Sequence, residues 1–338
     1  MDGSSEPLHN ILFTQPRTAS HLLTKILNLD AQPSIHPHSD KGYFFLKALG
    51  VRFRHDLSGK HIDMWSAQEN EDYRAALQGS YTEFENWLEE VENTGKGSYV
   101  KQHTSWLIEP VSETKFIYGR DSTNAKTWAI NVDSRDEVEH SKGNETILPS
   151  TTLLRLRPTF LIRHPALAFP SLLRTSIDNE GFEKVLNDEG TQKWEMTLHW
   201  TRSLYSWYLT HLSNLEKATK DEVITYPIIL DADDISKSAL MAKYAAAVGL
   251  DPSLIRFEWE AASPEELKGL SKTVQRMKDT ILASTKIVEG KDSRALILGD
   301  EKQKWKDEFG EVLAGRLVKF VDGAMDDYEW LKERRLKG

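Results

Sequence analysis

The segment LHNILFTQPRTASHLLTK, residues 8–25, sets the first expectation about the fold of this chain. It begins with a short apolar run, passes through a turn rich in hydroxyl groups at Pro16, and continues with the pattern of a helix. A strand, a polar turn and a helix in this order can bind an anion, because free backbone amides and the positive helix end face the ligand. Arg17, Thr18 and Ser20 would add a cation and two hydroxyl groups. An ordinary helix cap is the alternative.

Apolar runs and helical patterns alternate along the rest of the chain. Helices are predicted at 66–94, as one or two segments, and at 191–217, where aromatic residues recur at helical spacing. Further strands are predicted in SYVKQHTSWLI (98–108), in the first part of PTFLIRHPALAFPSLLRT (158–175) and in VITYPIILDADDI (223–235). Strands that alternate with helices predict an α/β fold with a parallel sheet.

Composition and charge exclude several classes of protein. Of the 338 residues, 39% are hydrophobic and 28% are charged, which suffices to bury a core. No run approaches the roughly 20 apolar residues of a membrane-spanning helix, and no secretory signal pattern is visible, so we expect a cytoplasmic protein with no membrane partner. The formal net charge is −9, which argues against nucleic acid as a partner. Without cysteine, disulfides and thiol chemistry are excluded.

Two polar regions have less specific patterns. Residues 119–148 show little periodicity, which predicts a loop or a mobile lid near the middle of the chain. His36, His38 and His61 are candidate zinc ligands, but no carboxylate partner lies at a suitable spacing. We therefore interpret these histidines as loop residues and predict no metal site.

Two motifs together resemble the nucleotide-binding segments of sulfotransferases that use 3′-phosphoadenosine 5′-phosphosulfate (PAPS). The family's first loop reads Pro-Lys/Arg-Ser-Gly-Thr/Ser-Thr, and residues 16–21 here read PRTASH. Its second motif is a strand that ends in arginine, a turn with proline, and a serine eight residues after the arginine, which LIRHPALAFPS matches with Arg163 and Ser171. The resemblance implies that these two residues hold the 3′-phosphate. It places the 5′-phosphosulfate against the loop residues Arg17, Thr18, Ala19, Ser20 and His21.

A third motif of the family, Lys-x-His at the end of a central strand, is matched by Lys101 and His103 in YVKQHTSW. The resemblance implies that His103 is the general base for an acceptor hydroxyl and that Lys101 offsets charge on the transferred sulfuryl group. The alternative is that both residues share the polar face of an edge strand. Trp65 and Trp106 are candidates for walls of the acceptor pocket, with a plain role in the core as the alternative.

The resemblance covers the chain from about residue 10 to about residue 320. The PRTASxLL form of the turn is similar to a branch common in filamentous fungi, where many members belong to small-molecule biosynthesis. The family implies a three-layer α/β/α fold with a central mainly parallel sheet, related to P-loop NTPases. It also implies a single domain spanning 1–338, as a monomer or a homodimer.

Three departures from the family pattern concern the nucleotide. Ala19 replaces the loop glycine, where a methyl group is costly if the backbone needs a positive φ. His21 replaces a threonine at the 5′-phosphate end. The family's Arg-Lys-Gly clamp before the C-terminal tryptophan is not visible, and Lys291 or Arg294 of GKDSR would have to substitute for it.

The leading hypothesis is therefore sulfuryl transfer from PAPS to a hydroxyl group of a small-molecule acceptor in secondary metabolism. A second hypothesis is a lyase, cyclase or isomerase on the same fold, which uses His103 on a biosynthetic intermediate without PAPS. A third is a non-catalytic binding protein. A shared fold does not decide among them.

Overall fold

A four-stranded sheet lies at the centre of the computed structural model, which describes residues 8–38, 41–132, 141–212, 216–218 and 223–338. All pairings in this sheet are parallel, and the strand order is β2-β1-β3-β6. Its strands are β1 His9–Thr14, β2 Ser98–His103, β3 Arg157–Ile162 and β6 Ile228–Asp231. A second, antiparallel sheet pairs β4 Glu216–Ala218 with β5 Val223–Thr225. The predicted α/β class with a parallel sheet is confirmed.

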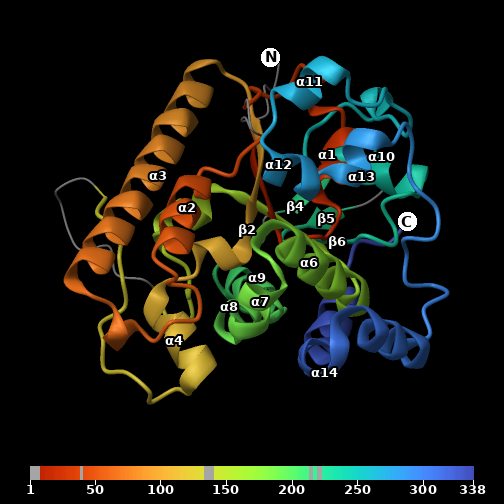
Figure 1. Ribbon diagram of the computed structural model, residues 1–338. Helices are drawn as coiled ribbons and strands as arrows, with labels where there is room; N and C mark the ends of the chain where they lie inside the picture. The colour runs from red at the N-terminus through yellow and green to blue at the C-terminus, as the bar shows by residue number, and fades with distance from the viewer. Residues whose placement is uncertain (1–7, 39–40, 133–140, 213–215, 219–222) are drawn as a thin grey trace.

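Helices cover both faces of the sheet (Figure 1). The α-helices are α1 Ser20–Ile26, α2 Leu46–Arg54, α3 Ala67–Asn93, α4 Pro110–Tyr118, α5 Ser150–Arg155, α6 Pro165–Glu180, α7 Phe182–Asn187, α8 Glu189–Glu195, α9 His199–His211, α10 Ser238–Ala247, α11 Pro264–Lys268, α12 Lys272–Met277, α13 Asp279–Ala283 and α14 Leu298–Glu333. Short 3₁₀ segments are η1 Leu29–Ala31, η2 Ile62–Met64, η3 Thr104–Leu107 and η4 Pro252–Leu254.

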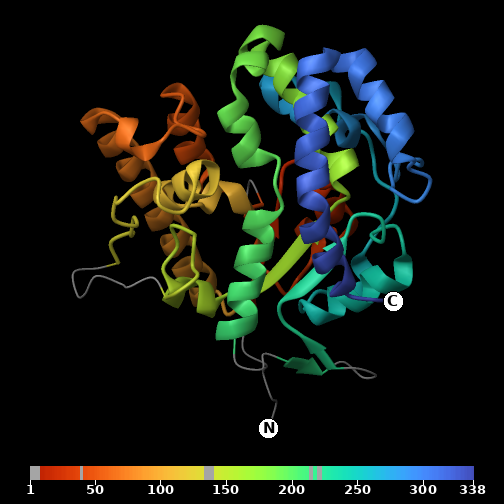
Figure 2. The ribbon, with the colours of Figure 1, turned by 90° about the horizontal axis from the view of Figure 1, so that it is seen from below.

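Strand β1 shows why the fold has three layers. Ile11 and Phe13 point into a core that includes buried residues of α3, α6, α9 and α14, whereas Leu12 points into a second core with α1 and α10. Both faces of the strand are therefore apolar, as expected for a parallel sheet covered on both sides. Figure 2 shows α9 and α14 lying beside each other over one face.

Two predicted segments are interrupted in the structure. The helix expected at 191–217 is wrong as one segment, because the chain leaves helical geometry at Met196 between α8 and α9, and Glu216–Ala218 forms strand β4 instead. This break lets Trp194 and Trp200 enter the same core cluster, with the Trp200 indole donating to the Trp194 carbonyl at 2.9 Å. The strand expected at 223–235 is divided into β5 and β6 because Pro227 has no amide hydrogen for a strand ladder. The helix is therefore broken by tertiary packing, whereas the strand is broken by the local chemistry of proline.

The region 119–148 packs against the protein at several buried residues, and residues 133–140 lie outside the described residues. Trp128 and Ile130 are buried, and the Arg74 guanidinium lies 3.6 Å from the Trp128 ring centroid. The Gln78 side chain exchanges two hydrogen bonds with the backbone of Asn131, at 3.0 and 2.9 Å. These contacts attach the segment before residue 133 to α3, and closure of a lid stays a prediction.

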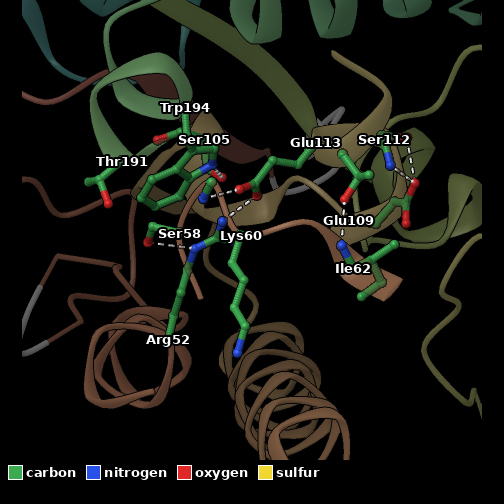
Figure 3. Close-up of polar contacts among 12 residues, drawn as sticks. Arg52, Ser58, Lys60, Ile62, Ser105, Glu109, Ser112, Glu113, Thr191 and Trp194 are labelled. Atoms are coloured by element: carbon green, nitrogen blue, oxygen red, sulfur yellow. Dashed lines mark hydrogen bonds and ion pairs between the residues drawn. The ribbon is translucent and has the colours of Figure 1, made fainter. Parts of the chain in front are cut away.

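A buried ion pair joins α2 to α4 (Figure 3). The Arg52 guanidinium pairs with the Glu113 carboxylate, and both side chains are almost fully buried. Arg52 also donates to Ser58 at 2.9 Å, and the amide of Gly59 donates to Glu113 at 2.7 Å. The guanidinium carbon lies 4.0 Å from the ring centroid of Trp194 on α8. This network therefore ties three helices together through one buried cation.

Replacement of Glu113 by alanine is expected to lower the free energy of unfolding by about 3–5 kcal/mol, because Arg52 would remain as a buried, unpaired charge. Urea denaturation measures this loss. The matched control is Glu83→Ala, which breaks the exposed pair with Lys47 and should cost no more than about 1 kcal/mol. Equal losses in the two variants would contradict the prediction.

Candidate active site

Parallel pairing brings the ends of the four strands to one edge of the sheet. Thr14 at the end of β1 pairs with His103 at the end of β2. On the other side, Ile162 at the end of β3 pairs with Asp231 at the end of β6. Ligands bind α/β sheets of this kind beyond the carboxyl ends of the strands. Arg163, which directly follows β3, lies at the same edge.

His103 is buried and holds a hydrogen bond on each ring nitrogen. Its Nδ1 lies 2.7 Å from the Thr14 hydroxyl, and its Nε2 lies 3.2 Å from the Tyr43 hydroxyl. Burial and the nearby Lys101 lower the pKa of His103 to about 3, although a hydrogen bond to the Thr14 backbone acts in the opposite direction. The imidazole is thus neutral at physiological pH, with one ring nitrogen that carries no proton.

Lys101 points to the same face of β2 as His103, two residues away, and is only 1% exposed. Its Nζ lies 2.8 Å from Nδ1 of His21 on α1 and 4.8 Å from the ring centroid of Tyr43. Burial, followed by repulsion from Lys278 and Lys41, lowers the pKa of Lys101 well below its ordinary value. Burial and Lys101 also lower the pKa of His21 well below its ordinary value.

Among the described residues, no carboxylate forms an ion pair with Lys101, His21 or His103. A buried lysine beside other cations is unfavourable unless an opposite charge can approach, since burial penalises the charged form. The arrangement is therefore suited to an anion that enters from outside the chain.

A second cationic group lies beside the first. The Arg17 side chain donates to the Ser171 hydroxyl at 3.0 Å and to the Met277 carbonyl at 2.6 Å. Arg163 donates to the carbonyls of Arg17 at 2.9 Å and Lys291 at 3.0 Å. The structure thus brings Arg17, Arg163 and Ser171 together, whereas the resemblance assigns Arg17 to the 5′-phosphosulfate and the other two residues to the 3′-phosphate. The loop with Lys291 reaches them through its backbone.

The loop between β1 and α1 has a strained backbone. Arg17 and Ala19 both have φ of 66°, in the left-handed region that costs a residue with a side chain about 1–2 kcal/mol. The glycine that the related motif carries at the Ala19 position would adopt this conformation freely. Thr18 is buried, and its hydroxyl donates to the Gln15 carbonyl at 2.8 Å, so this hydrogen bond stabilises the loop from within.

The two tryptophan candidates have different surroundings. The ring of Trp106, in η3, lies edge-on to His103 with centroids 4.5 Å apart. Trp65 instead packs against Tyr73 and Trp128 in the main core, where its contacts involve no predicted site residue. Trp106 is therefore at the site, and Trp65 has the core role that was its alternative.

Sequence reasoning missed Tyr43, which contacts both Lys101 and His103. Its hydroxyl also hydrogen-bonds the side chain of Ser20 at the start of α1. No motif marks this tyrosine, since it lies in the loop before α2. The only local signal is Gly42 before it, which passes so close to β2 that an added Cβ would lie 2.3 Å from the Lys101 carbonyl oxygen.

The described residues contain no cluster of three His, Cys, Asp or Glu side chains that could hold a metal ion. They likewise contain no helix both long and apolar enough to cross a membrane.

Comparison with known proteins identifies the class. The chain is 37% identical over 334 residues to "Sulfotransferase ppzF" of Metarhizium rileyi, which covers 98% of this chain and 97% of the relative. It is 37% identical over 341 residues to the protein of the same name from Metarhizium majus, covering 99% and 98%. No family model and no solved structure matches. The fold and these two relatives define a sulfotransferase-like enzyme.

In particular, the chain belongs to the sulfotransferase family that includes these two Metarhizium proteins, as its motifs predicted.

Binding of an anion beside Lys101 is expected to take up protons, because a nearby negative charge raises the depressed pKa values of Lys101 and His21. The bound protein then holds more protons than the free protein, so the dissociation constant should increase as the pH rises. Calorimetric titration with adenosine 3′,5′-bisphosphate, repeated in buffers of different ionisation enthalpy, measures this proton uptake. A pH of about 8 is suitable, because the phosphates of the nucleotide are then fully ionised. Lys101→Met should reduce the uptake, and zero uptake in the wild type would contradict the prediction.

Proposed function

We propose that this protein transfers a sulfuryl group from PAPS to a hydroxyl group of a small-molecule acceptor in a biosynthetic pathway. The observation that carries the proposal is Lys101, which is buried among cations beside a neutral His103. Sulfuryl transfer needs a fixed positive charge near the transferred group and a base near the acceptor. The names of the two relatives support the same reaction class.

The donor fits two groups of residues. Lys101 and the neighbouring His21 would face the sulfuryl end, next to His103. Arg163 and Ser171, with Arg17 between them, would hold the 3′-phosphate. Arginine and hydroxyl donors suit phosphate oxygens, and the hydrogen bonds that they now make to carbonyls and to Ser171 can be exchanged for stronger bonds to an anion. The donor supplies the activated sulfuryl group, and the chain supplies charge, orientation and a base.

The acceptor side favours an aromatic compound. Tyr43 and Trp106 flank His103, with their ring centroids 5.0 and 4.5 Å from the imidazole. Trp106 belongs to a cluster with Trp194 and Trp200, which makes the region beyond the base aromatic. Ring stacking and edge contacts would orient a flat acceptor with its hydroxyl toward the base.

The first test of donor binding is calorimetric titration with adenosine 3′,5′-bisphosphate. Arg163→Ala is expected to weaken binding about 10–100-fold, the equivalent of the 1.5–3 kcal/mol typical of a hydrogen bond to a charged group. Arg174→Ala is the matched control, since that arginine lies on α6, the helix that begins shortly after Arg163, in an exposed pair with Glu308. Absence of binding by the wild type at millimolar nucleotide would contradict PAPS use and favour nucleotide-free chemistry at His103.

The role of the base is tested with His103→Ala. Loss of general-base catalysis should lower kcat about 10²–10⁴-fold while nucleotide affinity stays near the wild-type value. His36→Ala is a suitable control, because His36 forms a surface pair with Glu90. Release of adenosine 3′,5′-bisphosphate in the presence of hydroxylated aromatic compounds measures turnover. Full activity of His103→Ala would exclude this histidine as the base.

A further inference from the structure

This inference rests on the proposed function and concerns the path of the acceptor's proton. The Nε2 atom of His103 is the nitrogen that faces away from Thr14, and the Tyr43 hydroxyl lies 3.2 Å from it. An acceptor hydroxyl cannot take the same lone pair while Tyr43 remains there. Either Tyr43 leaves, or the proton passes through it.

The charge states set the direction of these hydrogen bonds. Burial raises the pKa of Tyr43 to about 12, so its hydroxyl carries a proton at physiological pH. The pKa of His103 is lowered to about 3, so the ring is neutral, and its contact with Thr14 places the ring proton on Nδ1. Tyr43 therefore donates to Nε2, while the Ser20 hydroxyl donates to the oxygen of Tyr43. The phenol oxygen retains a lone pair for one more donor.

The backbone around Tyr43 argues against a residue that swings away. The Tyr43 amide donates to the Lys101 carbonyl at 2.9 Å, and the Lys101 amide donates to the Lys41 carbonyl at 3.0 Å. These bonds form a parallel bridge between Gly42 and Lys101. Tyr43 has φ of 60°, a conformation that is unusual for a bulky residue and persists only where its surroundings hold it.

The ring of Tyr43 is held as well. The Lys101 Nζ lies 4.8 Å from its centroid on one side, and the Trp106 ring lies 5.2 Å away. A bound anion that raises the pKa of Lys101 would place a protonated ammonium group beside this ring. Tyr43 thus has a fixed position and a proton directed at the base.

We propose that Tyr43 is a catalytic residue that relays the acceptor's proton to His103. The acceptor hydroxyl donates its proton to the Tyr43 oxygen as the Tyr43 proton moves to Nε2 of His103. The acceptor oxygen forms a bond to sulfur, while the bond from sulfur to the bridging oxygen of the donor's 5′-phosphate breaks and its electron pair leaves with that phosphate. His103 later returns the proton to solvent. The products are a sulfate ester and adenosine 3′,5′-bisphosphate.

Tyr43→Phe is the decisive variant, because it removes the hydroxyl and keeps the ring between Lys101 and Trp106. We expect kcat to fall about 10²–10³-fold, within the range of general acid–base catalysis, with nucleotide affinity unchanged. The matched control is Tyr99→Phe, on the same face of β2, which removes a buried hydroxyl bonded to Tyr244 at 2.7 Å. It should retain wild-type kcat.

Solvent isotope effects separate a relay from a structural role. The wild type should show a curved proton inventory, because two protons move in one step, and the remaining activity of Tyr43→Phe should show a linear one.

Thermal unfolding shows whether both tyrosine variants are folded. Imidazole ¹⁵N spectra of His103 in the wild type and in Tyr43→Phe measure the contact to Nε2 without turnover. Unchanged ¹⁵N signals would overturn the contact on which the relay depends.

The outcomes also distinguish this inference from the proposed function. Turnover of Tyr43→Phe equal to that of Tyr99→Phe, with an active wild type, would overturn the relay and leave sulfuryl transfer intact. A wild type that binds the nucleotide but shows no transfer to hydroxylated aromatic compounds would overturn the proposed function, and the relay with it. A large loss of kcat together with a linear wild-type inventory would also exclude the relay.

Discussion

The parallel pairing of β1 with β2 and β3 is the constraint on which the site depends. Residues far apart in sequence end their strands at one edge because the strands run in the same direction. The register places Thr14 directly beside His103, and this contact orients the imidazole. A shift of one residue would turn Lys101 and His103 to the opposite face of the sheet, since side chains alternate along a strand. Burial of both faces of β1 prevents such a shift.

A buried lysine with no carboxylate partner among the described residues is the second property of the site. Elsewhere the chain neutralises a buried cation with a carboxylate, as Arg52 and Glu113 show. Lys101 is as deeply buried as Arg52, yet its polar contact is a histidine. The two cases obey the same electrostatic rule, because burial of a charge needs a partner. For Arg52 the partner is Glu113 of the same chain, whereas for Lys101 we infer that a bound anion provides the opposite charge.

Strained backbone also occurs at this site. Arg17, Ala19 and Tyr43 all have positive φ; the first two precede Ser20 in the chain, and the Tyr43 ring lies beside Lys101. Such conformations persist when the surroundings determine them and are common at functional sites. At Ala19 the strain arises where the related motif has glycine, so the loop keeps its shape at a cost in stability. At Tyr43 it directs a hydroxyl toward the base.

The sequence alone determined the parallel α/β class and the family, because hydrophobic alternation and turn chemistry are local properties of the chain. It also placed Lys101 and His103 on one strand and Arg163 at the end of another, although the strand expected at 98–108 ends at His103. It did not predict the break at Met196, and for Trp65 it left a pocket role and a core role open, since both features depend on what packs against them. Only the tertiary structure decided which hydroxyl faces His103. Tyr43 lies 60 residues away in sequence, and its position depends on a loop pairing with the edge of β2, which no local pattern encodes.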